Sequence, residues 1–373
     1  MRIAFLHRSL SGGGTEADLR RMAVGLAARG HRVSVFAAKG SDALPGVRVH
    51  RVPVIRAGRL ARLVSFAMAA PRLAEAQGPF DLVVGFGRTL RQDVVRVGGG
   101  THRSYLARMQ RAGLRGPWLG PYHRAILWIE ERQFAAEAYR RVIAVSRVAR
   151  DEVRQDYGVP GDRIAVVYNG VDLERFHPRY RQDAGRRLRA AFGIPNELRV
   201  CAAVGNGFLR KGFDVLLALW REDPPPSTVL LLVGNDERLG RWRRAVAHGP
   251  LADRVLVAGP RGDIPAVLAA ADVVCMPSRQ EAFGNVVLEA CAAGVPVVTS
   301  RLSGAAELLG PPLDVLVIDD PGNRPALRAA ILHALGPEGP AFGQAARLRA
   351  EEFSWERHLD RLEHELGEAC GAR

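Results

Sequence analysis

The sequence predicts an α/β protein with two domains, each built on a parallel sheet covered by helices. Short apolar runs, each the length of a buried strand, alternate with helical segments along the whole chain. The alternation begins near residue 3 and begins again near residue 198, after a stretch rich in Arg and Pro. The 373 residues are enough for two domains with separate cores. We therefore expect a first domain over residues 1–170, a linker over 171–196 and a second domain over 197–353.

The first domain opens as a Rossmann-like unit of strand, glycine loop, helix and strand. Residues 3–6 form the strand, and a loop over residues 9–16 leads into a helix over residues 16–29. Gly30 ends this helix, and residues 31–36 form the next strand. The loop does not have the GxGxxG pattern of a dinucleotide site, so by itself it is also compatible with a simple tight turn.

The remaining elements continue the same alternation. Apolar runs predict the strands, and the amphipathic stretches between them predict the helices. In the first domain we expect strands at residues 47–54, 81–87, 141–146 and 163–168, and helices at residues 58–76 and 147–157. In the second domain we expect strands at residues 198–206, 229–234, 255–259, 273–276, 295–299 and 315–318, whereas residues 173–196 are expected to be weakly structured.

Three consecutive glycines, Gly98–Gly100, end an apolar run in the first domain and precede His102. Because glycine has no side chain, a backbone rich in it can approach a ligand closely. A ligand is therefore expected beside this loop, with His102 as a candidate catalytic residue. The alternative is that His102 is a structural histidine.

Two adjacent cations, Arg210 and Lys211, follow the first strand of the second domain and precede a helix. The helix dipole disfavours positive charge at a helix N-terminus, so a bound anion would resolve the conflict. Arg210 and Lys211 are therefore candidate ligands of an anion. The alternative is a pair of solvated surface charges.

The most informative stretch begins at Glu281, in the loop after the strand at residues 273–276. In open parallel sheets, ligands bind at the carboxyl ends of strands. Phe283, Gly284 and Asn285 start a helix that is apolar apart from Glu289, so the helix is expected to be buried all round. A lone buried carboxylate is costly without a partner. Either Glu281 and Glu289 contact a ligand, or Glu289 meets a core Arg and Glu281 caps the helix.

Two glutamates eight residues apart, with Phe-Gly-Asn between them, resemble the donor-site motif of the retaining family 4 glycosyltransferases. These enzymes have the GT-B fold, in which two Rossmann-like domains face each other across a cleft. The resemblance assigns Glu281 to the donor sugar, Glu289 to the nucleotide ribose, and Arg210 and Lys211 to the donor diphosphate. It also places the segment formed by Phe283, Gly284 and Asn285 in the donor site.

The resemblance extends over nearly the whole chain. It places Gly13 and Gly14 beside the donor phosphates and Asp18 in the cleft, although Asp18 is equally suited to stabilise a helix dipole from the surface. The stretch around residues 93–105 is similar to that of the subgroup that glucosylates a heptose of the lipopolysaccharide core, except that Gly98–Gly100 replaces an acidic residue found in some members. The last helix, about residues 354–373, is expected to pack back on the first domain.

Composition limits where the protein works and what it binds. The four cysteines have no metal or redox spacing, and three lie in apolar runs, as expected of core thiols in the cytoplasm. The net charge of +14 suits nucleic acid, an anionic membrane or a phosphorylated substrate. No helix-turn-helix, zinc or RNA-binding pattern is present, so we do not expect a nucleic-acid partner.

Residues 103–132 are the candidate membrane contact. They contain six Arg and two Glu, with Trp118 and Trp128 among them. Basic and aromatic side chains favour an anionic lipid surface, so the protein is expected to be peripheral on the inner face of the cytoplasmic membrane. The alternative is that Trp128 and Ile129 are core residues and the arginines are merely solvated.

The activity that the resemblance implies is transfer of a sugar, with retention, from a nucleotide-sugar to a lipid-anchored glycan. UDP-glucose and a lipopolysaccharide-core heptose are the expected substrates. The nucleotide-sugar is a co-substrate, so no cofactor is expected. No metal is expected either, because no Asp-x-Asp pair lies near the donor site. The alternatives are another nucleotide-sugar enzyme of this fold, such as an epimerase, and a different lipid acceptor.

Overall fold

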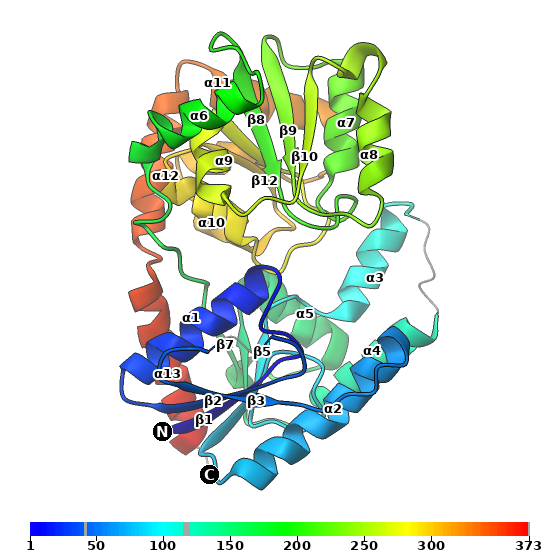
Figure 1. Ribbon diagram of the computed structural model, residues 1–373, viewed down its shortest axis with the longest axis vertical. Helices are drawn as coiled ribbons and strands as arrows, with labels where there is room; N and C mark the ends of the chain where they lie inside the picture. Colours follow the sequence, from blue (N-terminus) through cyan, green and yellow to red (C-terminus); the bar gives the residue numbers. More distant parts are fainter. Residues whose placement is uncertain (41–42, 115–119, 372–373) are drawn as a thin grey trace. The chain divides into compact units, whose positions relative to one another are not determined.

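The protein is described by a computed structural model over residues 1–40, 43–114 and 120–371. The chain divides into two compact units (Figure 1). Unit 1 comprises Met1–Asn169 and Glu356–Arg373, and unit 2 comprises Gly170–Trp355. Each unit contains one parallel sheet with helices packed on it, so the prediction of two Rossmann-like α/β domains is confirmed.

The sheet of unit 1 has the strand order β3-β2-β1-β4-β5-β6-β7, and every neighbouring pair is parallel. Its order reverses between β1 and β4, and ligands of open α/β sheets bind at the carboxyl ends of strands beside such a reversal. The strands are β1 (Arg2–Leu6), β2 (Arg32–Ala37), β3 (Val47–Arg51), β4 (Leu82–Gly85), β5 (Val94–Val97), β6 (Arg141–Ala144) and β7 (Ile164–Val166).

The helices of unit 1 bury apolar faces against this sheet and against each other. Phe66 and Ala70 of the second helix pack on Leu6 and Phe36, and Leu63 and Ala67 pack on the fourth helix. The helices are α1 (Gly14–Ala28), α2 (Gly58–Gln77), α3 (His102–Arg111), α4 (Pro121–Gln133), α5 (Arg147–Tyr157), the short 3-10 helix η1 (Gly161–Arg163) and α13 (Trp355–Gly371).

The C-terminal helix α13 packs on α1, as expected from the sequence. A Cβ added at Gly25 of α1 would lie 2.5 Å from Leu359 Cδ1, so the glycine lets the two helices pack closely. Arg29 pairs with Asp360 at 2.7 Å and with Glu363 at 3.0 Å. The last helix therefore completes the core of unit 1 from the far end of the chain.

Unit 2 has the strand order β10-β9-β8-β11-β12-β13, again parallel throughout, and its order reverses between β8 and β11. Its strands are β8 (Arg199–Val204), β9 (Thr228–Val233), β10 (Val255–Gly259), β11 (Val273–Met276), β12 (Val297–Ser300) and β13 (Val317–Ile318). Its helices are α6 (Ala184–Ala191), α7 (Phe213–Glu222), α8 (Leu239–Val246), α9 (Ile264–Ala270), α10 (Asn285–Ala292), α11 (Arg324–Leu335) and α12 (Gly339–Glu351). Its 3-10 helices are η2 (Pro178–Arg181), η3 (Gly249–Leu251), η4 (Gly304–Leu308) and η5 (Leu313–Leu316).

The expectation that residues 173–196 are weakly structured is wrong. They include η2 and α6, and α6 packs on α9 so closely that a Cβ at Gly185 would lie 2.5 Å from the Ala269 carbonyl oxygen. Arg189 of α6 pairs with Asp272 at 2.6 Å and donates to the Ala270 carbonyl at 2.8 Å. The many arginines in this stretch suggested weak structure. In the folded protein, Arg189 instead supplies the hydrogen bonds that fix α6 against its neighbours.

Candidate active site

Three charged side chains meet at the carboxyl ends of β8 and β11 in unit 2. Arg210 lies 2.7 Å from an oxygen of Glu281, and Lys211 pairs with the same oxygen. Lys211 is only 6% exposed. Burial raises the pKa of Glu281, but the charges of Lys211 and Arg210 outweigh it and lower the pKa to about 2. The site therefore holds two cations and one ionised carboxylate in a partly desolvated position.

Glycines allow the loops of this site to approach each other. Gly212 has a φ of +75°, and a Cβ there would lie 2.1 Å from the Pro277 carbonyl oxygen. Gly284 has a φ of +97°, and a Cβ there would lie 2.9 Å from Ser303 Oγ. Both residues are N-caps, of α7 and α10 respectively. The starts of both helices thus lie at the carboxyl ends of the strands, where the positive end of the helix dipole favours an anion.

Helix α10 is not buried all round, contrary to expectation. Asn285, Val286 and Glu289 are half-exposed, while the opposite face lies in the core. Glu289 is close enough to Lys211 for its charge to raise the pKa of that amine, although burial lowers the pKa more strongly. Glu289 thus belongs to the same site as Glu281. The half-exposed face of α10 is the one available to a ligand.

Phe283 lies at the same loop but its side chain is 2% exposed and packs in the core. Its carbonyl oxygen accepts hydrogen bonds from Ser303 Oγ at 2.9 Å and from the Ala305 N–H at 2.7 Å. Phe283 therefore fixes the loop that carries Glu281, and its side chain is not presented to a ligand.

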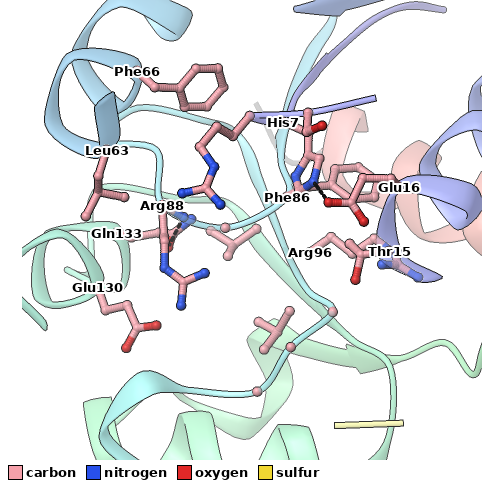
Figure 2. Close-up of a pocket in the computed structure, with 18 of the residues that line it drawn as sticks. His7, Thr15, Glu16, Leu63, Phe66, Phe86, Arg88, Arg96, Glu130 and Gln133 are labelled. Carbon is pink, nitrogen blue, oxygen red and sulfur yellow. Dashed lines mark hydrogen bonds and ion pairs between the residues drawn. The ribbon is translucent and has the colours of Figure 1, made fainter. Parts of the chain in front are cut away.

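Unit 1 contains a cavity of about 240 Å³ at the carboxyl ends of β1, β4 and β5 (Figure 2). Glycines form one wall of the cavity, as expected from Gly98–Gly100, and charged side chains from several elements form the others. The lining residues are His7, Arg8, Ser9, Thr15, Glu16, Leu63, Phe66, Phe86, Gly87, Arg88, Val95, Arg96, Val97, Gly98, Gly99, Gly100, Glu130, Gln133 and Phe134.

The residues expected from the glycine loop are close to this cavity but do not line it. Gly13 is the N-cap of α1 and Gly14 its first residue, and Thr15 and Glu16 after them reach the cavity. Asp18 is 4% exposed, so it is not a surface acid. Its carboxylate accepts a hydrogen bond from the Asn169 amide nitrogen at 3.1 Å, inside the core of unit 1.

His102 starts α3 beside the cavity without lining it. Its Nε2 lies 2.8 Å from Nδ1 of His123, and its backbone N–H donates to the buried carboxylate of Glu130 at 2.9 Å. Burial, with the charges of Arg88 and His123, lowers the pKa of His102 to about 3. The imidazole is therefore neutral at neutral pH. Glu130, which the sequence analysis did not single out, is an acid that reaches the cavity, as Glu16 does.

Arg96 is a further lining residue that the sequence analysis did not single out. It is 2% exposed, donates to Asn169 Oδ1 at 2.6 Å and lies over the Phe86 ring at 5.1 Å. Asn169 links it to Asp18. A charged residue within the apolar run of β5 was the available signal, because a strand buried on both faces rarely accepts one without a partner.

Comparison with known proteins identifies the family. The sequence matches the model of Glycosyltransferase Family 4 over residues 12–175 and that of Glycosyl transferases group 1 over residues 199–336. A D-inositol 3-phosphate glycosyltransferase of Saccharomonospora viridis is 33% identical, in an alignment that covers 96% of this chain and 90% of that protein. The chain belongs to glycosyltransferase family 4. It is therefore a glycosyltransferase, as the spacing of Glu281 and Glu289 indicated.

Solved structures similar to this family 4 chain share its fold. WaaG, a glycosyltransferase involved in lipopolysaccharide biosynthesis, superimposes with a TM-score of 0.82 at 23% identity, over 96% of this chain and 98% of WaaG. HepE of Anabaena, in a complex with UDP-glucose, superimposes with a TM-score of 0.75 at 21% identity, over 99% of this chain and all of HepE. The predicted GT-B fold is thus confirmed.

The segment 103–132 of this family 4 enzyme forms α3 and α4, and its Arg115 and Trp118 lie outside the described residues. Arg108 pairs with the buried Glu152 at 2.7 Å, so one of the expected surface cations is neutralised. Trp128 is 40% exposed, with Arg132 stacked 3.9 Å from its ring. In the described parts of the chain, no helix combines the length and the hydropathy needed to span a bilayer.

Proposed function

We propose that this glycosyltransferase moves a hexose from a nucleotide-sugar to an acceptor hydroxyl with retention at the anomeric carbon. The observation that supports this best is the convergence of Arg210, Lys211 and Glu281 at the starts of α7 and α10. The two cations suit a diphosphate, and the carboxylate suits sugar hydroxyls. Glu289 on the half-exposed face of α10 suits a ribose. UDP-glucose is the first donor to test, because it is bound in the similar HepE structure.

In the mechanism that we infer, the acceptor oxygen forms a bond to the anomeric carbon as the bond from that carbon to the diphosphate oxygen breaks. The departing phosphate oxygen takes the proton of the acceptor hydroxyl on the same face of the sugar. Arg210 and Lys211 stabilise the charge on the leaving diphosphate. This arrangement requires no divalent metal.

The proposed acceptor is a lipid-anchored glycan such as a lipopolysaccharide-core heptose, reached at the inner face of the cytoplasmic membrane. Likeness to WaaG supports it. The exposed Trp128 and the exposed Arg124 on α4 supply the aromatic and basic character of a membrane contact. A second candidate acceptor is a phosphorylated polyol, because the relatives at 33% identity are named for D-inositol 3-phosphate.

A two-stage experiment tests the function. Thermal unfolding is first recorded with UDP-, ADP- and GDP-sugars, since a bound donor raises the melting temperature by mass action. The stabilising donor is then incubated in EDTA with a heptose-core lipid, with D-inositol 3-phosphate or alone. A retained glycosidic product with one acceptor supports the proposal. If the donor alone yields an epimerised sugar, the protein is an epimerase and the proposed transfer reaction is wrong.

Membrane contact is tested by cosedimentation with phosphatidylglycerol and phosphatidylcholine vesicles at low and high salt. We expect binding to the anionic vesicles at low salt, and weaker binding after Trp128→Ala or Arg124→Ser. Arg108→Ser is not used as a variant, because Arg108 forms an ion pair with the buried Glu152 and its loss would disturb the fold. Equal binding to both vesicle types would show that α4 is not the contact with an anionic membrane.

A further inference from the structure

Arg279 ties together the two loops that carry the charged side chains of the site in unit 2. It lies between β11 and α10. Its guanidinium donates to the two carboxylate oxygens of Asp214, at 2.6 and 2.7 Å, and to the Leu209 carbonyl oxygen. Asp214 lies in the first turn of α7, and Leu209 comes directly before Arg210 and Lys211. The contacts of Arg279 therefore lie on both sides of the segment that holds the two cations.

The two loops exchange arginines in opposite directions. Arg279 reaches from the loop after β11 to the loop after β8, and its backbone N–H donates to the Arg210 carbonyl at 2.9 Å. Arg210 reaches the other way and donates to the Gln280 carbonyl oxygen at 2.9 Å and to Glu281 at 2.7 Å. The crossed pair of arginines thus fixes the segment with Arg210 and Lys211 relative to Glu281.

The partner of Arg279 is chosen for geometry as well as for charge. A guanidinium that meets both oxygens of a carboxylate fixes the distance and the orientation of the two groups, which an ammonium group does not do. The pairing also occupies the acid in the first turn of α7, Asp214. An unpaired carboxylate at this place would compete with a bound diphosphate for the neighbouring cations. Arg279 therefore acts on the loop and on its charges, from behind the ligand-facing side chains.

We propose that Arg279 is a positioning residue that sets how strongly the enzyme prefers a nucleoside diphosphate to the monophosphate. The inference rests on the proposed function, in which Arg210 and Lys211 hold the donor diphosphate. Two cations bind a diphosphate well only when both lie within hydrogen-bond distance of its oxygens, so a small shift of their loop loses much of the contribution of the second phosphate. The contact proposed for the ribose comes from Glu289 on α10, outside this loop. Arg279 is therefore expected to affect the phosphate end of the donor alone.

Calorimetry of UDP and UMP tests the inference with wild type, Arg279→Gln and Arg279→Lys. Arg189→Gln is the matched control, because the Arg189 side chain is 13% exposed, against 12% for Arg279, and pairs with Asp272 at the other end of β11. We expect wild type and Arg189→Gln to favour UDP by about 10- to 100-fold. Arg279→Gln should reduce that preference to about threefold or less, with the affinity for UMP unchanged. Arg279→Lys keeps a charge beside Asp214 without the planar fork, so its preference should lie between these two.

A preference for UDP that falls equally in Arg189→Gln and Arg279→Gln would show that Arg279 only supports the fold, and would overturn the inference. Full preference in a cooperatively unfolding Arg279→Gln protein also overturns it, and sugar transfer by that variant leaves the proposed function intact. If Arg279→Gln does not fold, Arg279→Lys decides, because full preference in that variant overturns the inference. If the thermal screen selects another base, its diphosphate and monophosphate replace UDP and UMP. A wild type that binds no nucleoside diphosphate overturns the proposed function and this inference together.

Discussion

Lys211 and Glu281 form an ion pair in unit 2, and Arg210 shares the same carboxylate oxygen. The two cations proposed for the donor diphosphate are thus held by the acid proposed for the donor sugar. Such an arrangement keeps the cations ordered without a ligand, because a buried charge needs a partner. A donor that binds must take over part of the contact with Glu281.

Glu281→Gln should destabilise the fold by about 3 kcal/mol at neutral pH, because it leaves Lys211 without its partner. The folded-state pKa of Glu281 is about 2, below its usual 4.5. The ionised carboxylate therefore makes its full contribution to the free energy of unfolding above pH 4.5. That contribution fades as the pH falls towards 2. Urea unfolding of wild type and variant should therefore give a difference that shrinks in this window. Glu222→Gln, which breaks an exposed pair with Arg324, is the control with an effect under about 1 kcal/mol.

Arg210→Ala combined with Lys211→Ala should lower kcat/KM by about 10²–10⁴, since each charge-assisted bond to the diphosphate contributes about 1.5–3 kcal/mol. Arg241→Ala removes an exposed charge from α8 in the same unit and should leave the rate unchanged. Steady-state kinetics with saturating acceptor measures both. A folded double variant with more than a tenth of wild-type kcat/KM would remove these cations from the donor site.

The meeting of charged side chains in unit 2 was largely predictable from sequence because its signals are local. The spacing of Glu281 and Glu289, and two cations before a helix, follow from neighbouring residues. The cavity in unit 1 was not predictable from sequence, apart from its glycine loop. Arg88 is identified by a backbone angle and Glu130 by its contacts with residues distant in sequence, and neither leaves a pattern along the chain.

His102 should stay neutral between pH 5 and 8. Its folded-state pKa of about 3 lies below the usual 6.5, so the native state binds fewer protons and His102 reduces stability as the pH falls from 6.5 towards 3. Imidazole nitrogen NMR shifts over pH 5–8 are the measurement, and the same resonance in urea should titrate. A shift with a midpoint in that range in the folded protein would contradict this and return His102 as an acid–base candidate.

Arg88→Gly should stabilise unit 1 by about 1 kcal/mol, because glycine adopts a φ of +61° without the Cβ strain. The same change removes a cation from the cavity wall, so binding of a phosphorylated polyol, the second candidate acceptor, should weaken. Thermal unfolding and acceptor KM report the two effects. A less stable variant would show that the Arg88 side chain supports the fold and is not retained for a ligand.

Unit 2 is proposed to bind a nucleotide-sugar through Glu281 and Glu289 without a metal. Calorimetry of UDP and UDP-glucose in EDTA tests it most directly, with wild type, Glu281→Gln, Glu289→Gln and the Glu222→Gln control. We expect Glu289→Gln to weaken both ligands by about tenfold or more, and Glu281→Gln to weaken UDP-glucose while sparing UDP. Wild-type affinities in both variants, or binding that disappears in EDTA and returns with Mg²⁺, would exclude this mode of donor binding.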